Sequence, residues 1–222
     1  MKRTLCATLR FLREDLVLPL AALPVFALLG VGLGVLVALL DTPQEAPLAA
    51  AVVMLLSGVL LTVVLSIVYF SNWFAVLLAF PANRRGLLAG LLLFCLGVSA
   101  LAQLTTLAVG SLCTLGFGAA FGQPLAMPWQ QIPAFVWPCC LLGPVLGGVV
   151  LGGLQCRFGA AAFWVVYFVF LGVCSTASWW LPVLTDRFSP TGLAALGAGA
   201  CLALLFLAAL AVRWLLRAAV KA

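Results

Sequence analysis

Long apolar stretches separated by short polar ones dominate this chain. Mostly apolar runs cover residues 16–40, 48–70, 87–116, 134–154, 158–181 and 191–216. A helix of roughly 20 apolar residues crosses the hydrocarbon core of a bilayer, so each run is long enough to span a membrane. Strands of a membrane barrel would instead alternate polar and apolar residues. The pattern therefore predicts an all-α fold, a polytopic transmembrane helical bundle of about six spans that forms a single transmembrane domain over 1–222.

The breaks between these runs are short and rich in turn-forming residues. The first lies at 41–47, and a less apolar patch at 71–73 follows the second run. The segment 118–133 contains three prolines and three glutamines. Because prolines end helices and remove backbone donors, we expect 118–133 to be a loop at the membrane surface.

The residues before the first run have an amphipathic pattern of their own. Leucines recur on one helical face, at positions Leu5, Leu9, Leu12 and Leu16, and basic residues occupy the other face. We expect residues 1–15 to form a basic amphipathic helix that lies in the inner headgroup layer. A frayed cytoplasmic tail that carries topogenic charge is the alternative.

Composition and charge agree with a membrane location. The chain is 66% hydrophobic and 7% charged, whereas a soluble domain is about one quarter charged. With six spans, every Lys and Arg except Arg187 lies on the same side of the membrane as the termini, and the acidic Asp41, Glu45 and Asp186 lie on the other. The positive-inside rule then predicts a multi-pass protein of the cell (plasma) membrane with both termini cytoplasmic. The net charge of +6 therefore indicates topogenic charge, and no nucleic acid is expected as a partner.

Several kinds of chemistry are missing from the sequence. It has no histidine, no GxxxxGK[ST] phosphate loop and no CxxC spacing among its eight cysteines. No acidic or basic side chain falls near the middle of a span, where proton-coupled carriers place their relays. We therefore expect no catalytic residue, no metal site, no bound cofactor and no enzymatic activity.

Weakly polar and small residues remain within the spans. The polar ones form two clusters, Gln103, Thr105 and Thr106 in the third run and Ser175, Thr176 and Ser178 in the fifth. Such residues either line a substrate pathway or form hydrogen bonds between helices. Glycines spaced four apart in the fourth run, such as Gly143 and Gly147, permit close helix contact within the bundle or across a dimer.

Three features together resemble a known layout. The first is the basic amphipathic helix. The second is a turn-forming basic loop between the second and third runs, made of Phe80, Pro81, Ala82, Asn83, Arg84, Arg85 and Gly86. The third is the turn Arg157-Phe158-Gly159 followed by Phe163 and Trp164. With these features the chain resembles the permease subunit of the short six-span ABC exporters of the type-2 class of Gram-positive bacteria. Leu87 and Leu88 stand where that family tends to place an aromatic residue.

The resemblance implies a function and partners. The chain would be the membrane-spanning permease of an ATP-driven exporter, and 80–86 would form the coupling loop seated on a separate ATP-binding ABC subunit. Two permeases, as a homodimer or heterodimer, would assemble with two ATPases. Two other hypotheses stay open: a non-transporting membrane scaffold or immunity protein, and the substrate-capturing subunit of a vitamin importer.

The charge distribution gives a direct topology test. Reporter fusions at Ala222 and near Gln123 are expected to give opposite signals, cytoplasmic at Ala222 and external near Gln123, because basic loops stay inside. The measurement is paired alkaline phosphatase and fluorescent-protein activity at each site. Matching signals at the two sites would be incompatible with the six-span arrangement.

Overall fold

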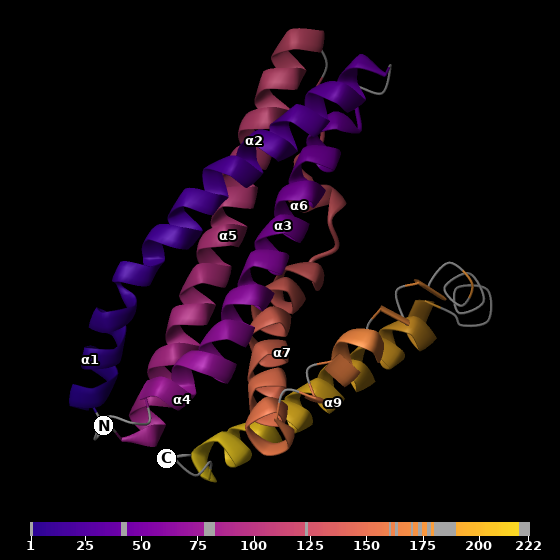
Figure 1. Cartoon of the computed structure of the whole chain (residues 1–222). Coiled ribbons are helices and arrows are strands. Elements are labelled where there is room, and N and C mark those ends of the chain that lie inside the picture. Colours follow the sequence, from indigo (N-terminus) through magenta and orange to yellow (C-terminus); the bar gives the residue numbers. More distant parts are fainter. Residues whose placement is uncertain are drawn as a thin grey trace. The chain divides into compact units, whose positions relative to one another are not determined.

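The structure is a computed structural model that describes residues 2–40, 44–77, 83–122, 124–159, 161–162, 164–169, 171–172, 175–176, 179 and 190–217. Within these ranges all regular secondary structure is helical and no strand occurs (Figure 1). The all-α helical bundle predicted from the apolar pattern is therefore confirmed.

The helices follow the apolar runs closely. The chain begins with α1 (Lys2–Leu12) and a 3₁₀ turn (Glu14–Leu16), and continues with α2 (Val17–Leu39) and α3 (Ala46–Val68). A π-helical turn (Tyr69–Trp73) joins α3 to α4 (Phe74–Leu77). The remaining labelled helices are α5 (Arg84–Phe121), α6 (Pro128–Gln131), α7 (Val136–Phe158) and α9 (Pro190–Arg217).

Five helical segments within the described residues are long and apolar enough to cross a membrane. They are Glu14–Leu39, Ala46–Trp73, Arg84–Phe121, Val136–Phe158 and Gly197–Arg217. These segments correspond to five of the runs predicted as spans. The other run, 158–181, lies partly outside the described residues, so its crossing stays a prediction. The chain thus has the architecture of a multi-span membrane protein.

Two of the predicted breaks between helices are partly or wholly helical in the structure. The patch at 71–73 does not interrupt the helix, because the backbone continues through a π-helical turn and the Ser71 hydroxyl donates to the Ile67 carbonyl at 2.5 Å. The predicted loop at 118–133 is also partly helical. α5 continues to Phe121, where Gly122 ends it in the left-handed region (φ 66°), and α6 occupies Pro128–Gln131.

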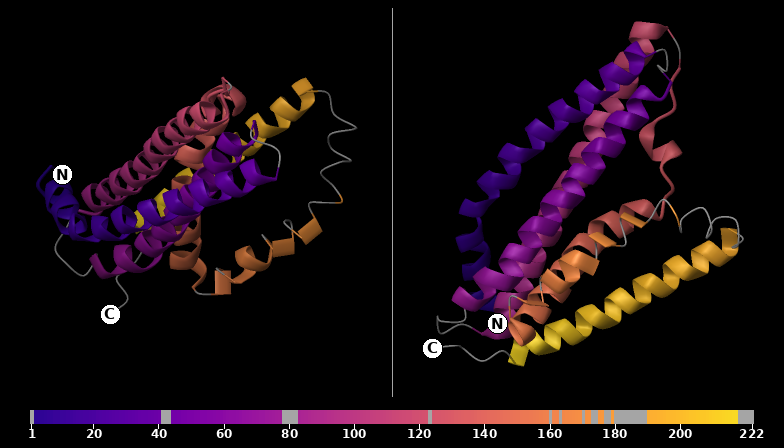
Figure 2. Two further views of the ribbon diagram at one scale, coloured as in Figure 1. Left: turned by 90° about the horizontal axis from the view of Figure 1, so that it is seen from above. Right: turned by 45° about the vertical axis from the view of Figure 1, so that its right-hand side comes forward.

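The chain divides into two compact units. Unit one comprises Met1–Ser66 and Ala82–Val145, and unit two comprises Ile67–Pro81 and Leu146–Ala222. In unit one, α3 and α5 run side by side in every view (Figures 1 and 2). α5 also packs against α1, α2 and α6, which makes it the central helix of this unit.

Small residues allow the close helix contacts of unit one. A Cβ atom added to Gly58 of α3 would lie 2.9 Å from the Ala102 Cβ of α5. A Cβ added to Gly30 of α2 would lie 2.9 Å from the Ala50 carbonyl oxygen of α3. Helices in lipid associate through such close backbone approach, since lipid removes the hydrophobic drive that operates in water.

In unit one, part of the apolar face of α1 packs against α5. A Cβ on Gly90 of α5 would lie 2.9 Å from the Thr8 Cγ2, and Leu12 is fully buried. Arg10 and Arg13 are exposed on the other face, as the amphipathic pattern predicts. Part of the face that was expected to rest on lipid therefore packs on α5, because the first turns of α5 present the small Gly90. The interfacial location of α1 stays a prediction.

Unit two is held by two adjacent glycines of α7. A Cβ on Gly152 would lie 2.5 Å from the Phe70 Cβ and 2.8 Å from the Phe70 carbonyl oxygen, and a Cβ on Gly153 would lie 2.6 Å from the Ala211 Cβ of α9. By contrast, apart from the adjacent backbone of α7 itself, no atom in the described part of the chain lies within 4 Å of a Cβ added to Gly147. A side chain therefore has no room at Gly152 or Gly153, whereas it has room at Gly147.

This difference predicts opposite effects for two matched substitutions. Gly152→Ala should destabilise the protein by about 1–3 kcal/mol, because the Phe70 backbone has to move away from the new methyl group. Gly147→Ala should be neutral or stabilise by up to about 1 kcal/mol, since alanine is the better helix former. Thermal denaturation of both purified variants in the same detergent measures the difference. Equal melting temperatures for the two variants would contradict the packing of α7 described above.

Candidate functional site

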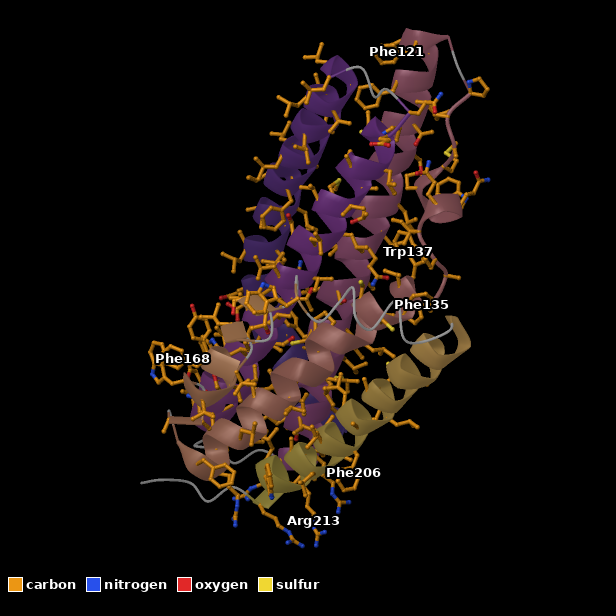
Figure 3. The ribbon with its side chains drawn as sticks, turned by 90° about the vertical axis from the view of Figure 1, so that its right-hand side faces the viewer. Phe121, Phe135, Trp137, Phe168, Phe206 and Arg213 are labelled. Carbon is orange, nitrogen blue, oxygen red and sulfur yellow. The ribbon has the colours of Figure 1, made fainter. Side chains whose placement is uncertain are left out.

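The polar residues of α5 face the first turns of α7 in unit one. The Ser99 hydroxyl lies 3.0 Å from the Leu141 carbonyl oxygen and 3.3 Å from that of Cys140. One turn along α5, the Gln103 Nε2 donates to the Trp137 carbonyl at 2.9 Å. Trp137 lies at the start of α7 (Figure 3). The side chains of α5 therefore bind backbone atoms of a neighbouring helix.

A proline explains why Ser99 lies where it does. Pro144 is within α7 and has no N–H, so it cannot donate to the carbonyl of the residue four positions earlier, Cys140. In a membrane, an unpaired carbonyl is costly, and side chains of neighbouring helices can pair it. The Ser99 hydroxyl lies within hydrogen-bond distance of the Cys140 carbonyl at 3.3 Å, and it shares its proton with the closer Leu141 carbonyl at 3.0 Å. Sequence reasoning singled out Gln103 but not Ser99; the signal that could have found it is Pro144 together with a serine one turn before Gln103.

The other weakly polar residues within the spans bond to their own helices. The Thr105 hydroxyl donates to the Leu101 carbonyl at 2.8 Å and the Thr106 hydroxyl to the Ala102 carbonyl at 3.0 Å. In the fifth run the hydroxyls of Ser175 and Thr176 lie 3.1 and 2.7 Å from one carbonyl, that of Gly172, while Ser178 lies outside the described residues. The structure brings Gln103 together with α7, whereas these two contacts of Ser175 and Thr176 lie within the fifth run.

Two spaces adjoin α5 in unit one. A narrow space lies among α3, α5 and α7 beside Ser99, Gln103 and Thr106, and no part of it has room for a water-sized sphere. An open groove of about 470 Å³ lies between α2 and α5. Its lining is almost wholly apolar, made of Val31, Val35, Val109, Leu112, Cys113, Gly116, Phe117 and Ala120. The described structure thus has a narrow space beside the polar residues of α5 and an open apolar groove on another side of the same helix.

The proposed coupling loop leads directly into α5. Phe80, Pro81 and Ala82 lie outside the described residues. Asn83 caps the helix, since its Oδ1 accepts a hydrogen bond from the Arg85 N–H at 3.1 Å. The helix then places Arg85 on the surface and buries Gly86. Leu87 and Leu88, at the position where the resemblance expects an aromatic residue, are also buried.

The predicted inner turn at Arg157 has aromatic partners in unit two. The Arg157 guanidinium lies 6.0 Å from the centre of the Phe158 ring, and Phe158 packs edge-on against Trp214 of α9 with their ring centres 6.0 Å apart. Gly159 follows in the left-handed region, with φ 76°. Phe163 lies outside the described residues, and Trp164 packs against Tyr167 and Phe168. The sequence did not reveal the pairing of Phe158 with Trp214, because it joins two helices far apart in the chain.

Within the described ranges, no group of three or more histidine, cysteine or acidic residues is placed to hold a metal ion. Comparisons with family models, with curated proteins and with solved structures find no match to this chain. Its function therefore has to be argued from its own residues and geometry.

A double-mutant cycle tests the role of Ser99. Ser99→Ala should cost about 0.6–1.7 kcal/mol, the range of interhelical hydrogen bonds in membrane proteins. In a Pro144→Ala background the cost should be smaller, because the backbone N–H gained at position 144 can donate to the Cys140 carbonyl and only the bond from Ser99 to the Leu141 carbonyl is still needed. Unfolding free energies from denaturant titration in mixed micelles provide the comparison.

Thr105→Ala is the control for this cycle. Its hydroxyl bonds within α5 and should cost the same with or without Pro144. If Ser99→Ala costs as much in both backgrounds, the proposed pairing of Ser99 with the proline-freed carbonyl is wrong.

Proposed function

We propose that this chain is the membrane-spanning permease subunit of an ATP-driven, ABC-type exporter, which provides the translocation pathway and is coupled to a separate ATPase subunit. The multi-span helical architecture is compatible with this function. The single observation that carries the proposal furthest is the course of α5, which starts at the basic loop and runs through the centre of unit one.

The length of α5 suits the transmission of force. It has 38 residues, which at 1.5 Å per residue gives about 57 Å, well beyond the ~30 Å hydrocarbon core. A helix of this length extends out of the bilayer and can be contacted by a soluble partner. Because it is continuous from Arg84 to Phe121, a displacement of its first turn is carried to Ser99 and Gln103 in the middle of the helix.

The start of α5 is also firmly held. Asn83 fixes the first turn through its cap, and Gly86, Leu87 and Leu88 are buried immediately afterwards. α1 packs on the next turn, through Thr8 against Gly90. A partner that binds the loop at 80–86 would therefore act on a rigid, packed element, and α1 would move with it.

The proposal includes a second permease subunit, the same chain or a related one. Apart from the adjacent backbone of α7 itself, no atom of the described residues lies within 4 Å of a Cβ added to Gly143 or Gly147, so each leaves room for close approach by another helix. Close approach at small residues is the usual way in which membrane helices associate. The assembly would then contain two permeases and two ATP-binding subunits.

A second candidate function, a non-transporting membrane scaffold, is favoured by a specific observation. The polar side chains of α5 bond to backbone carbonyls, and the narrow space beside Ser99 and Gln103 has no room for a water-sized sphere. A scaffold needs no pathway, whereas an exporter has to open one during its cycle. The two functions differ in their dependence on an ATPase.

The coupling loop provides the test between them. Phe80→Ala should reduce co-purification of the partner ATPase and permease-stimulated ATP hydrolysis more than Arg84→Ala does. An aromatic anchor buried in an interface can be worth several kcal/mol, whereas an exposed ion pair contributes up to about 1 kcal/mol. The measurements are pull-down in mild detergent and ATP hydrolysis by the purified complex.

Phe121→Ala is the matched control for this experiment. Phe121 is an exposed phenylalanine at the other end of α5, so its loss should leave the complex intact. If no ATPase co-purifies with the wild-type protein, or if Phe80→Ala behaves like Phe121→Ala, the scaffold function replaces the exporter function.

A further inference from the structure

Three arginines lie at the carboxyl ends of two helices in unit two. Arg157 is in the last turn of α7, and Arg217 is in the last turn of α9, with Arg213 one turn before it. All three side chains are exposed. Arg213 lies near the end of α9 in Figure 3. We refer to Arg157, Arg213 and Arg217 as the arginine cluster.

Packing between α7 and α9 brings these two helix ends together. Gly153 lies against Ala211, a contact that falls one turn before Arg157 on α7 and just before Arg213 on α9. At the next turn, Phe158 and Trp214 pack edge to face. Each ring follows directly after one of the arginines in the sequence, so the ring contact joins the two basic ends at one edge of unit two.

The part of unit two that the structure describes has no acidic residue to balance the arginine cluster. The helix carboxyl ends carry partial negative charge and favour the nearby arginines, but their carbonyls cannot neutralise three guanidinium groups. An anion from outside the chain is the natural partner for such a cluster.

The position of the arginine cluster identifies the kind of anion. The arginines follow apolar helices of spanning length, so they lie where the hydrocarbon meets the headgroups. Phe158 is 61% exposed beside them and packs against Trp214. Tryptophan is enriched at membrane interfaces. Guanidinium groups bind phosphate oxygens in pairs, with a geometry that lysine cannot reproduce.

We propose that the arginine cluster, together with Phe158 and Trp214, binds the headgroup phosphate of an anionic phospholipid in the leaflet that faces the chain termini. The guanidinium groups contact the phosphate, and the rings pack on the upper part of the acyl chains. Basic sites between spanning helices are known to recognise anionic headgroups. This role adds to the topogenic role of the same charges and does not depend on the exporter function.

Lipid binding by the full-length protein tests the proposal. The purified protein in mild detergent is titrated with phosphatidylglycerol or with phosphatidylcholine, and retained lipid is counted by native mass spectrometry. We expect tighter retention of phosphatidylglycerol. Replacing all three arginines by glutamine should weaken it roughly a hundredfold, since each basic residue contributes a factor of about five at an anionic surface.

Two further variants separate the lipid site from general charge effects. Arg10→Gln, Arg13→Gln and Arg85→Gln together remove three exposed arginines from unit one. Because α1 is itself expected at the headgroup layer, this variant should lose some phosphatidylglycerol retention, but clearly less than the glutamine variant of the arginine cluster. Replacing the arginine cluster by lysines keeps the topogenic charge, so this variant inserts normally even if the glutamine variant does not. It should still lose at least about fivefold in retention, because lysine cannot form the paired contacts to phosphate.

Four outcomes would overturn the proposal. One is equal retention of the two lipids by the wild-type protein. Another is full retention of phosphatidylglycerol by the lysine variant. The third is equal loss by the variants of unit one and unit two, which would indicate a diffuse electrostatic attraction. In the fourth, the lysine variant keeps its lipid but loses a co-purifying acidic protein, and the arginine cluster is then a protein-docking surface.

Discussion

Hydrogen bonding of the backbone within an apolar bundle is the constraint on which the rest of this structure depends. In hydrocarbon no water is available, so each carbonyl that a helix leaves unpaired needs a partner from the protein. Pro144 leaves the Cys140 carbonyl without its helical donor, and Ser99 of α5 places a hydroxyl 3.3 Å from it and 3.0 Å from the Leu141 carbonyl. Side-chain hydroxyls need partners for the same reason, and those of Thr105 and Thr106 donate to carbonyls of their own helix. Polar residues within the bundle thus stabilise helices and fix the register of α5 on α7.

Close packing then follows from small residues at the same helix faces. Gly58 and Ala102 bring α3 against α5, and Gly90 accepts Thr8 of α1. In unit two, Gly152 and Gly153 perform the same task within that unit. α5 packs against α1, α2, α3 and α6, and its polar side chains donate hydrogen bonds to α7. The position of α5 therefore determines the arrangement of unit one. A helix with so many partners cannot move alone, which is why the capped first turn is the point where a partner would act with most effect.

The apolar pattern was sufficient to predict the fold class and five of the spans, because crossing the bilayer requires length and apolarity, and both are local properties of the sequence. It was less informative where a helix can continue through polar residues. Ser71 bonds to its own helix and so does not end it, and α5 continues past Gly118 because no proline occurs before Pro124. The candidate site was predictable only in part. Gln103 stood out as a polar residue in an apolar run, whereas the pairing of Ser99 with α7 and of Phe158 with Trp214 joins helices far apart in the chain.

The distribution of charge limits how any movement in this protein can be driven. No acidic or basic residue lies near the middle of a predicted span, so a proton-driven step has no charged relay there. Exposed arginines lie instead at helix ends, with Arg85 in the first turn of α5 and the arginine cluster in the last turns of α7 and α9. On the proposed function, energy would enter at such ends, by contact with a protein or with lipid headgroups. The two kinds of helix end would have different partners. The capped and packed start of α5 suits contact with a protein that displaces the helix. The exposed arginine cluster with its aromatic rings suits binding of a lipid headgroup that anchors the chain. A permease driven from a single loop would need a contact that moves α5 and a contact that anchors the protein. A displacement of α5 changes the pathway only if the other helices keep their position in the membrane.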